Sequence, residues 1–108
     1  MIGAKYTEAV VLVAEFMGSR VGYVSSYLIE REHGEICDIV VEKSLRGIAI
    51  GSNLLLETLD MLRQRGIKSV DAVVRFDYTE GIKFLSSHGF NFIEPMPSGI
   101  FNVYERDI

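Results

Sequence analysis

The chain has 108 residues, 48% of them hydrophobic, which supports one core and hence a single domain spanning residues 1–108. Its net charge of −4 and pI near 5.1 exclude nucleic acid as a general partner, and the single cysteine, Cys37, excludes an internal disulfide framework. The longest apolar run, Ala9 to Ala14, is too short to cross a bilayer, and no signal-peptide region precedes it, so we expect no membrane association and a cytoplasmic location.

Three strands are predicted in the first half of the chain, because apolar and β-branched residues are concentrated there between turn residues. Gly18 tolerates a positive φ and so favours a hairpin between the first two strands, and the polar residues 30–34 form the next turn. The third strand ends in the apolar run Ile39-Val40-Val41, which is typical of a strand covered on both faces and therefore central in its sheet. The three strands span Ala9–Phe16, Val21–Ile29 and Glu35–Val41.

The second half of the chain predicts two helices and three further strands. A stripe of leucines between Leu55 and Leu62 indicates an amphipathic first helix. A second helix, capped by Asp77 or Thr79, extends to Ser87, and Gly89 ends it. The strands span Ser69–Phe76, Asn91–Glu94 and Ile100–Glu105.

The element order is therefore β-β-β-α-β-α-β-β, which predicts an α/β (α+β) fold with a mixed, mostly antiparallel sheet. The connection through the first helix must be a right-handed crossover, so the strands on either side of this helix are parallel. We expect at least one helix on each face of the sheet.

The segment from Val40 to Ser52 carries the clearest functional pattern. A strand enters a turn of small residues that opens the first helix. Free backbone N–H groups point outwards at a helix N-terminus, and the helix dipole favours negative charge there, so such a turn can hold a phosphate. Arg46 lies where a cation could reach that phosphate. The alternative is a plain strand–helix turn, and the glycine spacing fits neither a P-loop nor the dinucleotide-binding pattern.

This turn resembles the cofactor-binding turn of the GNAT superfamily of N-acetyltransferases. The signature of that family is Gln/Arg-x-x-Gly-x-Gly/Ala at the start of a long helix, preceded by a Val-rich strand. Arg46-x-x-Ala49-x-Gly51 matches this signature at two of its three fixed positions.

Two further motifs support the resemblance. The family often ends its second conserved helix with an aromatic pair followed by Gly-Phe, and Ile82, Phe84 and Gly89-Phe90 fit this spacing. The family's hairpin, a glycine turn before a Val-Gly strand, is similar to Gly18 through Val21-Gly22. The resemblance covers residues 9–104 and implies a small, N-terminally truncated member with the GNAT-like acyl-CoA N-acyltransferase fold.

The resemblance also implies a binding site for acetyl-CoA, used as the co-substrate. The strand Ile39-Val40-Val41 would offer backbone groups to the pantetheine arm. Tyr78, which stands where many members have an Asn, is either a further cofactor contact or a lid over the core. The diphosphate would be held by Arg46 and by the amides of Gly47, Ile48, Ala49, Ile50, Gly51 and Ser52.

Other departures from the family pattern concern activity. Only Met1–Glu8 precede the hairpin, where the family usually has a strand and one or two helices that build the acceptor site. Ala49 replaces the usual first Gly, and its amide can still bind phosphate if φ stays negative. Leu85 stands where a Tyr is the frequent general acid, and leucine cannot protonate a thiolate, although a thiol with a pKa near 8.5 needs little help.

Asp38 and Glu35 are the candidate general bases, because both lie on the strand expected beside the thioester. Each also has a structural interpretation: Glu35 as a solvated residue at a strand start, and Asp38 as a carboxylate held by a partner. A base used by some members on the following strand would fall at Val73, which cannot serve. His88 is interpreted as a cation at a helix end, and Cys37 as a small buried hydrophobe.

The sequence thus predicts an N-acetyltransferase that moves acetyl from acetyl-CoA directly to an amine of a small molecule or protein, without an acyl-enzyme. One alternative is a GNAT-like module that binds CoA or a partner protein without turnover, and another is a structural domain without a ligand. We also predict a homodimer, which would cover the sheet surface that the missing N-terminal helices leave bare, and no metal site.

Overall fold

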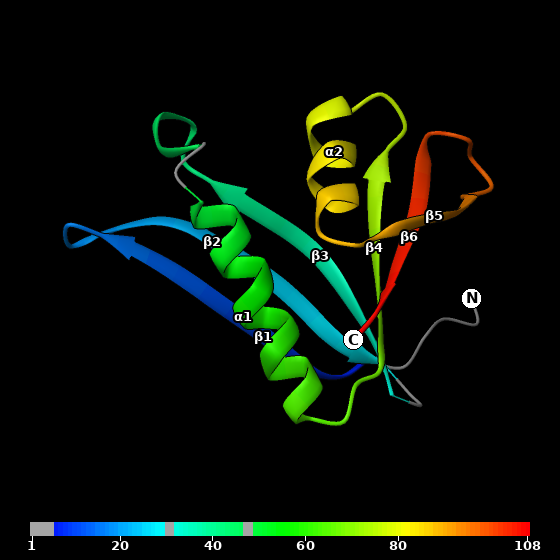
Figure 1. Cartoon of the computed structure of the whole chain (residues 1–108), viewed down its shortest axis with the longest axis horizontal. Coiled ribbons are helices and arrows are strands. Elements are labelled where there is room, and N and C mark those ends of the chain that lie inside the picture. Colours follow the sequence, from blue (N-terminus) through cyan, green and yellow to red (C-terminus); the bar gives the residue numbers. More distant parts are fainter. Residues whose placement is uncertain (1–5, 30–31, 47–48) are drawn as a thin grey trace.

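In the computed structural model, which describes residues 6–29, 32–46 and 49–108, the chain forms one six-stranded sheet with two α-helices (Figure 1). The strands are β1 (Tyr6–Phe16), β2 (Ser19–Ile29), β3 (His33–Val41), β4 (Ser69–Arg75), β5 (Asn91–Pro95) and β6 (Phe101–Asp107). The helices are α1 (Ile50–Gln64) and α2 (Thr79–Ser87), and a short 3-10 turn, η1 (Lys43–Leu45), follows β3. The predicted order of elements is confirmed.

The sheet is mixed, as predicted, with the strand order β1-β2-β3-β4-β6-β5. β3 and β4 are parallel, as the right-handed crossover through α1 requires, and every other neighbouring pair is antiparallel. β3 is central, as its apolar end predicted.

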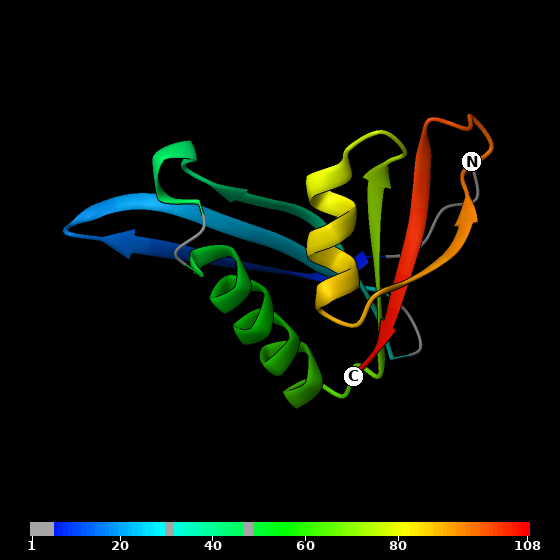
Figure 2. The same ribbon diagram turned by 45° about the horizontal axis from the view of Figure 1, so that its top comes forward.

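Both described helices lie on the same face of the sheet, which corrects the expectation of a helix on each face (Figure 2). The topology explains this arrangement. β4 and β5 both run antiparallel to β6, so β3, β4 and β5 point the same way and follow one another across the sheet. Two right-handed connections that advance in the same direction place their helices on the same side.

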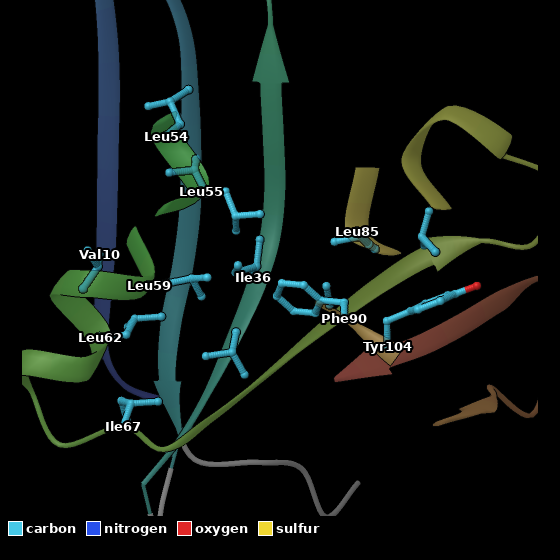
Figure 3. Close-up of a cluster of buried hydrophobic side chains, with 14 of the residues drawn as sticks. Val10, Ile36, Leu54, Leu55, Leu59, Leu62, Ile67, Leu85, Phe90 and Tyr104 are labelled. Atoms are coloured by element: carbon cyan, nitrogen blue, oxygen red, sulfur yellow. The ribbon is translucent and has the colours of Figure 1, made fainter. Parts of the chain in front are cut away.

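The hydrophobic core lies between this face and the two helices (Figure 3). The leucine stripe of α1 is buried as the sequence predicted: Leu55 and Leu62 are 0% exposed and Leu59 is 1% exposed. Leu85 of α2 and the adjoining Phe90 extend the same cluster over β4 and β6. One continuous core therefore supports both helices.

The end of α2 follows the prediction, whereas its start does not. The Phe90 N–H donates to the Leu85 carbonyl at 3.0 Å, and Gly89 has a φ of +81°, which together make the expected Schellman motif. The N-cap, however, is Tyr78, and no side chain caps the helix. Asp77 instead accepts a bond from Arg75 Nε at 2.8 Å, so its carboxylate is turned away from the helix.

The opposite face of the sheet carries no helix within the described ranges. Four apolar side chains on β1, β2 and β3 are about half exposed there: Val11 (57%), Val13 (49%), Tyr23 (40%) and Val40 (41%). The Ile39–Val41 run is therefore covered on one face only, because its central place in the sheet does not supply a second layer. No described helix is long and apolar enough to cross a membrane.

Candidate functional site

β3 and β4 are paired at one end and separate at the other. Their ladder consists of four residue pairs, from His33 with Ser69 to Ile36 with Ala72 (Figure 1). Cys37 comes next on β3 and is an extra residue opposite β2, because Ser26 pairs with Ile36 and Ser25 already pairs with Asp38. Such a β-bulge bends its strand. We infer that this bulge turns β3 away from β4.

A cleft of about 680 Å³ opens where the two strands separate. Its walls come from β3 and β4, and the first turn of α1 and one side of α2 close it. Eight residues that the sequence predicted for the site line it: Asp38, Ile39, Val41, Arg46, Ala49, Gly51, Ser52 and Tyr78.

Three other predicted residues, Glu35, Val40 and Ile50, are not among the residues that line the cleft. Glu35 lies on β3 within the paired end, opposite Tyr27 and Asp71. Val40 lines a separate apolar hollow on the bare face together with Val11 and Tyr23. Gly47 and Ile48 lie outside the described residues.

The edge of β3 that faces the cleft presents backbone groups of alternate residues. The Glu42 N–H donates to the Val21 carbonyl at 2.7 Å, which sets the phase of the antiparallel ladder with β2. Because these directions alternate along a strand, the backbone N–H and C=O groups of Val40 point toward β2, and those of Ile39 and Val41 point toward the cleft. Of the three residues predicted to meet a pantetheine arm, Ile39 and Val41 therefore have suitably placed backbone groups, and Val40 does not.

The α1 helix begins at Ile50 with a mostly open first turn. Its first intrahelical bond runs from the Asn53 N–H to the Ala49 carbonyl at 2.9 Å, so the amides of Ile50, Gly51 and Ser52 precede the ladder. No side chain of the described chain caps this terminus. Three main-chain donors and the positive end of the helix dipole thus lie together, which suits an anion.

Ala49 corrects one expectation about this turn. Its φ is +67°, in the left-handed region, and not the negative value on which its phosphate contact was conditional. Ala49 is the N-cap residue, where the chain turns into α1. Glycine would adopt this left-handed conformation without strain, whereas alanine does not. A Cβ in this conformation costs about 1–2 kcal/mol.

Two arginines line the cleft, together with the carboxylates of Asp38 and Glu80. Arg46 follows η1, is exposed, and donates from Nε to the Val41 carbonyl at 3.2 Å, which holds it beside the mouth of the cleft. Arg75 at the end of β4 also lines the cleft and pairs with Asp77 at 2.8 Å. The sequence analysis missed Arg75, which belongs to no motif and reaches the cleft only because β4 ends there.

His88 links the two helices, a role that its prediction as a helix-end cation did not include. Its Nδ1 lies 2.7 Å from the Phe84 carbonyl, which can only accept, so Nδ1 carries the proton. Nε2 lies 3.0 Å from Ser52 Oγ and accepts the hydroxyl proton when the ring is neutral. This bond joins the end of α2 to the first turn of α1 beside the cleft.

Asp38 and Cys37 provide the acid–base groups on the β3 wall. The Asp38 carboxylate accepts a weak bond from Ser25 Oγ at 3.4 Å. Cys37 is exposed and not buried as expected, because the bulge turns it out of the core. Partial desolvation, reinforced by the carboxylates of Glu35 and Asp38, raises the pKa of the Cys37 thiol to about 11. A thiol with this pKa is a poor nucleophile near neutral pH.

The cleft contains a phenol, although the sequence position of the family's tyrosine does not supply it. Leu85 lines the cleft as well as belonging to the core, but its side chain is apolar and 6% exposed, so it has no proton to offer there. Tyr78 lines the cleft and is 49% exposed, with its ring directly over Gly81. A Cβ on Gly81 would lie 2.6 Å from a ring carbon of Tyr78, so Gly81 makes this ring position possible.

Several solved structures share this fold at low sequence identity. PaiA N-acetyltransferase from Thermoplasma acidophilum, in complex with coenzyme A, has a TM-score of 0.87 and 20% identity over 93% of this chain. A candidate streptothricin acetyltransferase from Bacillus anthracis, in complex with acetyl coenzyme A, has a TM-score of 0.85 and 13% identity over 93% of this chain. An acetyltransferase from Bacillus cereus has a TM-score of 0.76 and 25% identity over 94% of this chain. The fold is that of the GNAT acetyltransferases.

The sequence itself identifies the family. Residues 3–90 match the acetyltransferase (GNAT) family, and the chain belongs to this family. No curated protein sequence matches it. The chain spans 61% of the length of PaiA, 62% of the B. anthracis protein and 74% of the B. cereus protein.

Proposed function

We propose that the chain binds acetyl-CoA in the cleft between β3 and β4 and transfers the acetyl group to an amine. One observation carries this proposal: the first turn of α1, with three amides ahead of the helical ladder and no side-chain cap, opens beside Arg46 at the mouth of the cleft. These are the elements of an anion site. Coenzyme A in the PaiA structure and acetyl coenzyme A in the B. anthracis structure support this choice of ligand.

The binding roles follow from the positions of the backbone groups. The amides of Ile50, Gly51 and Ser52 would hold the diphosphate, with the Arg46 guanidinium as its counter-charge. The groups of Ile39 and Val41 that face away from β2 would bond to the amides of the pantetheine arm, as a further strand would. The acetyl end would then reach the bulge at Cys37, where the strands meet.

In the transfer step, the amine nitrogen would attack the thioester carbon and the carbon–sulfur bond would break. The amine must lose a proton, and the Asp38 carboxylate is the cleft-lining candidate to accept it, directly or through water. The leaving thiolate gains a proton, for which the Tyr78 phenol is the cleft-lining candidate that Leu85 cannot be. The high pKa of the Cys37 thiol favours direct transfer without an acyl-enzyme.

Isothermal titration with acetyl-CoA tests the binding half of this proposal. We expect saturable binding at one site, weakened about tenfold in Arg46→Ala because a charge-assisted contact to phosphate is lost. Arg63→Ala is the matched control: it removes the same charge from the exposed last turn of α1, where Arg63 pairs only with Asp60 in the described chain, and should bind as the wild type does. A folded chain without heat of binding would reject the site.

The alternative function is a module that holds CoA without turnover. The identity of Leu85 supports it, because this apolar side chain lines the cleft at the position of the family's frequent acid and cannot donate a proton. Release of free thiol from acetyl-CoA with a panel of small amines and peptide amines separates the two functions. Tight CoA binding without thiol release with any acceptor would favour the module.

We also propose that a second copy of the chain covers the bare face of β1, β2 and β3. The half-exposed side chains of Val11, Val13, Tyr23 and Val40 support this homodimer, because apolar groups gathered on one sheet face favour association. Light scattering that gives a monomer mass at high concentration would reject it. The cytoplasmic location remains a prediction from the sequence.

A further inference from the structure

A second group of functional side chains lies at the paired end of β3 and β4, away from the cleft. His33 begins β3, Asp71 lies in β4, and Glu105 lies in β6 directly opposite Asp71. Their sequence neighbours Gly34, Val70 and Tyr104 are buried on the helical face, so alternation places all three on the bare face. Three adjacent strands thus present an imidazole and two carboxyl groups side by side.

The three side chains converge closely enough to share one ion. His33 Nε2 lies 2.8 Å from Asp71 Oδ2, and one ligand atom from each of the three residues falls within 4.8 Å of the others. His33 Nδ1 lies 2.7 Å from Ser69 Oγ. Metal-binding histidines are commonly oriented in this way, with one ring nitrogen held by a neighbour and the other turned to the ion.

Among the described residues, no lysine or arginine pairs with Asp71 or Glu105. Asp71 Oδ1 is buried and has no hydrogen-bond partner among the described residues, which is unusual for a carboxylate oxygen. The lysine and arginine nearest to these carboxylates in sequence have other partners. Lys68 pairs with Glu32, and Arg106 lies on the helical face and donates to the His88 carbonyl at 2.9 Å.

We propose that His33, Asp71 and Glu105 bind one zinc ion, with His33 ligating through Nε2 and each carboxylate through one oxygen. One nitrogen and two oxygen ligands suit Zn²⁺, which takes a fourth ligand such as water. Mg²⁺ and Ca²⁺ prefer sites of oxygen alone. This inference does not depend on the proposed acetyl transfer.

The position of this zinc site indicates a structural role. Within the described sheet, the four residue pairs between β3 and β4 join strands β1–β3 to strands β4–β6. An ion held by β3, β4 and β6 would fasten the two parts of the sheet at the point where they meet. It would also hold the closed end of the cleft without touching the cleft itself.

Titration of the metal-stripped full chain with Zn²⁺ tests the site. We expect one ion per chain, with affinity reduced at least about tenfold in His33→Ala and in Glu105→Gln. His88→Asn and Cys37→Ser are the controls, since they remove the other histidine and the single cysteine, and both should bind as the wild type does. Zn²⁺ at a hundredfold excess over its Kd should raise the Tm of the wild type by about 10 °C.

Glu105→Gln keeps the proposal falsifiable even if His33→Ala fails to fold, because glutamine has the shape of glutamate. In EDTA this variant should melt no lower than the wild type, and Zn²⁺ should raise its Tm far less. Three results would overturn the proposal: no saturable Zn²⁺ binding, wild-type affinity in both ligand variants, or preference for Mg²⁺ or Ca²⁺ over Zn²⁺.

Discussion

The two ends of β3 and β4 differ sharply, although the same two strands build both. At the His33 end the strands are hydrogen-bonded neighbours, and ionisable side chains crowd together on the bare face. At the Val41 end the strands have separated, the groups between them are mainly apolar or main-chain, and a cleft replaces the ladder. The closed end holds the sheet together, and the open end leaves main-chain donors and acceptors available to a ligand.

One residue, Cys37, lies at the boundary between the paired end and the open end. The extra residue Cys37 falls immediately after Ile36, the last β3 residue paired with β4. Within the sheet, a strand edge without a partner is a liability, but inside a cleft it is a binding surface. We infer that this bulge of one residue changes the following stretch of β3 from a paired strand into a wall of the cleft.

The largest effect, on the free energy of unfolding, is expected from disrupting the hydrophobic core that supports both the paired end and the open end of β3 and β4. Phe90 is 2% exposed, and Phe90→Ala should lower the free energy of unfolding by about 3–5 kcal/mol, since it removes a large buried ring. Phe76→Ala is the control, because Phe76 is 54% exposed and its loss should change stability by less than about 0.5 kcal/mol. Urea denaturation measures both. Similar losses in the two variants would show that Phe90 is not a core residue.

The next largest effect separates the candidate bases at the two ends. Asp38→Asn should lower kcat about 100-fold and leave CoA affinity nearly unchanged, because Asp38 lines the cleft and is proposed to accept the proton of the amine. Glu35→Gln should leave kcat within about twofold, because Glu35 lies at the closed end. Steady-state thiol release measures both. A greater loss in Glu35→Gln would reverse the assignment.

The reactivity of the Cys37 thiol, at the boundary between the paired and open ends of β3, is predicted to depend on pH. With its pKa raised to about 11, the thiol stays protonated at pH 8, and its thiolate fraction grows as the pH rises toward 11. A thiolate with a higher pKa is intrinsically more nucleophilic, which offsets part of its lower abundance. Cys37 should therefore react with Ellman's reagent at pH 8 roughly 20-fold more slowly than a free cysteine. The single cysteine makes the signal unambiguous. Reaction at the rate of the denatured chain would contradict the raised pKa.

The smallest effect concerns the turn into α1. Ala49 has a φ of +67°, so Ala49→Gly should relieve strain, and after the greater chain entropy of glycine is subtracted the gain is about 0.5 kcal/mol. Ala49→Val should lose stability, because a β-branched residue tolerates this conformation poorly. Thermal unfolding compares the two. Equal Tm values would mean that the turn is not left-handed in solution.

Much of the fold was predictable because it depends on local patterns. The leucine stripe of α1 and the Gly89-Phe90 helix end are periodic or conformational signals, and both are confirmed. The main-chain donors at the start of α1 were predictable for the same reason, since small residues between a strand and a helix expose such donors wherever they occur. Their role in binding an anion stays a prediction.

The remainder depends on register and topology, which local patterns do not encode. No pattern near Cys37 announces a bulge, and the expectation of helices on both faces failed because the direction of the second connection depends on where β5 pairs. His33, Asp71 and Glu105 meet only after three strands align, so no spacing in the sequence predicts their cluster. The left-handed Ala49 was likewise hidden, because alanine rarely adopts that conformation.

The most direct test of the central claim is a titration of the ¹⁵N-labelled chain with coenzyme A, followed by amide chemical shifts. We predict that the largest shifts fall on Ile50, Gly51 and Ser52, with smaller shifts at Ile39 and Val41, and little change in the paired part of β3. Saturation of the chain with coenzyme A without a shift in the first turn of α1 would contradict the account.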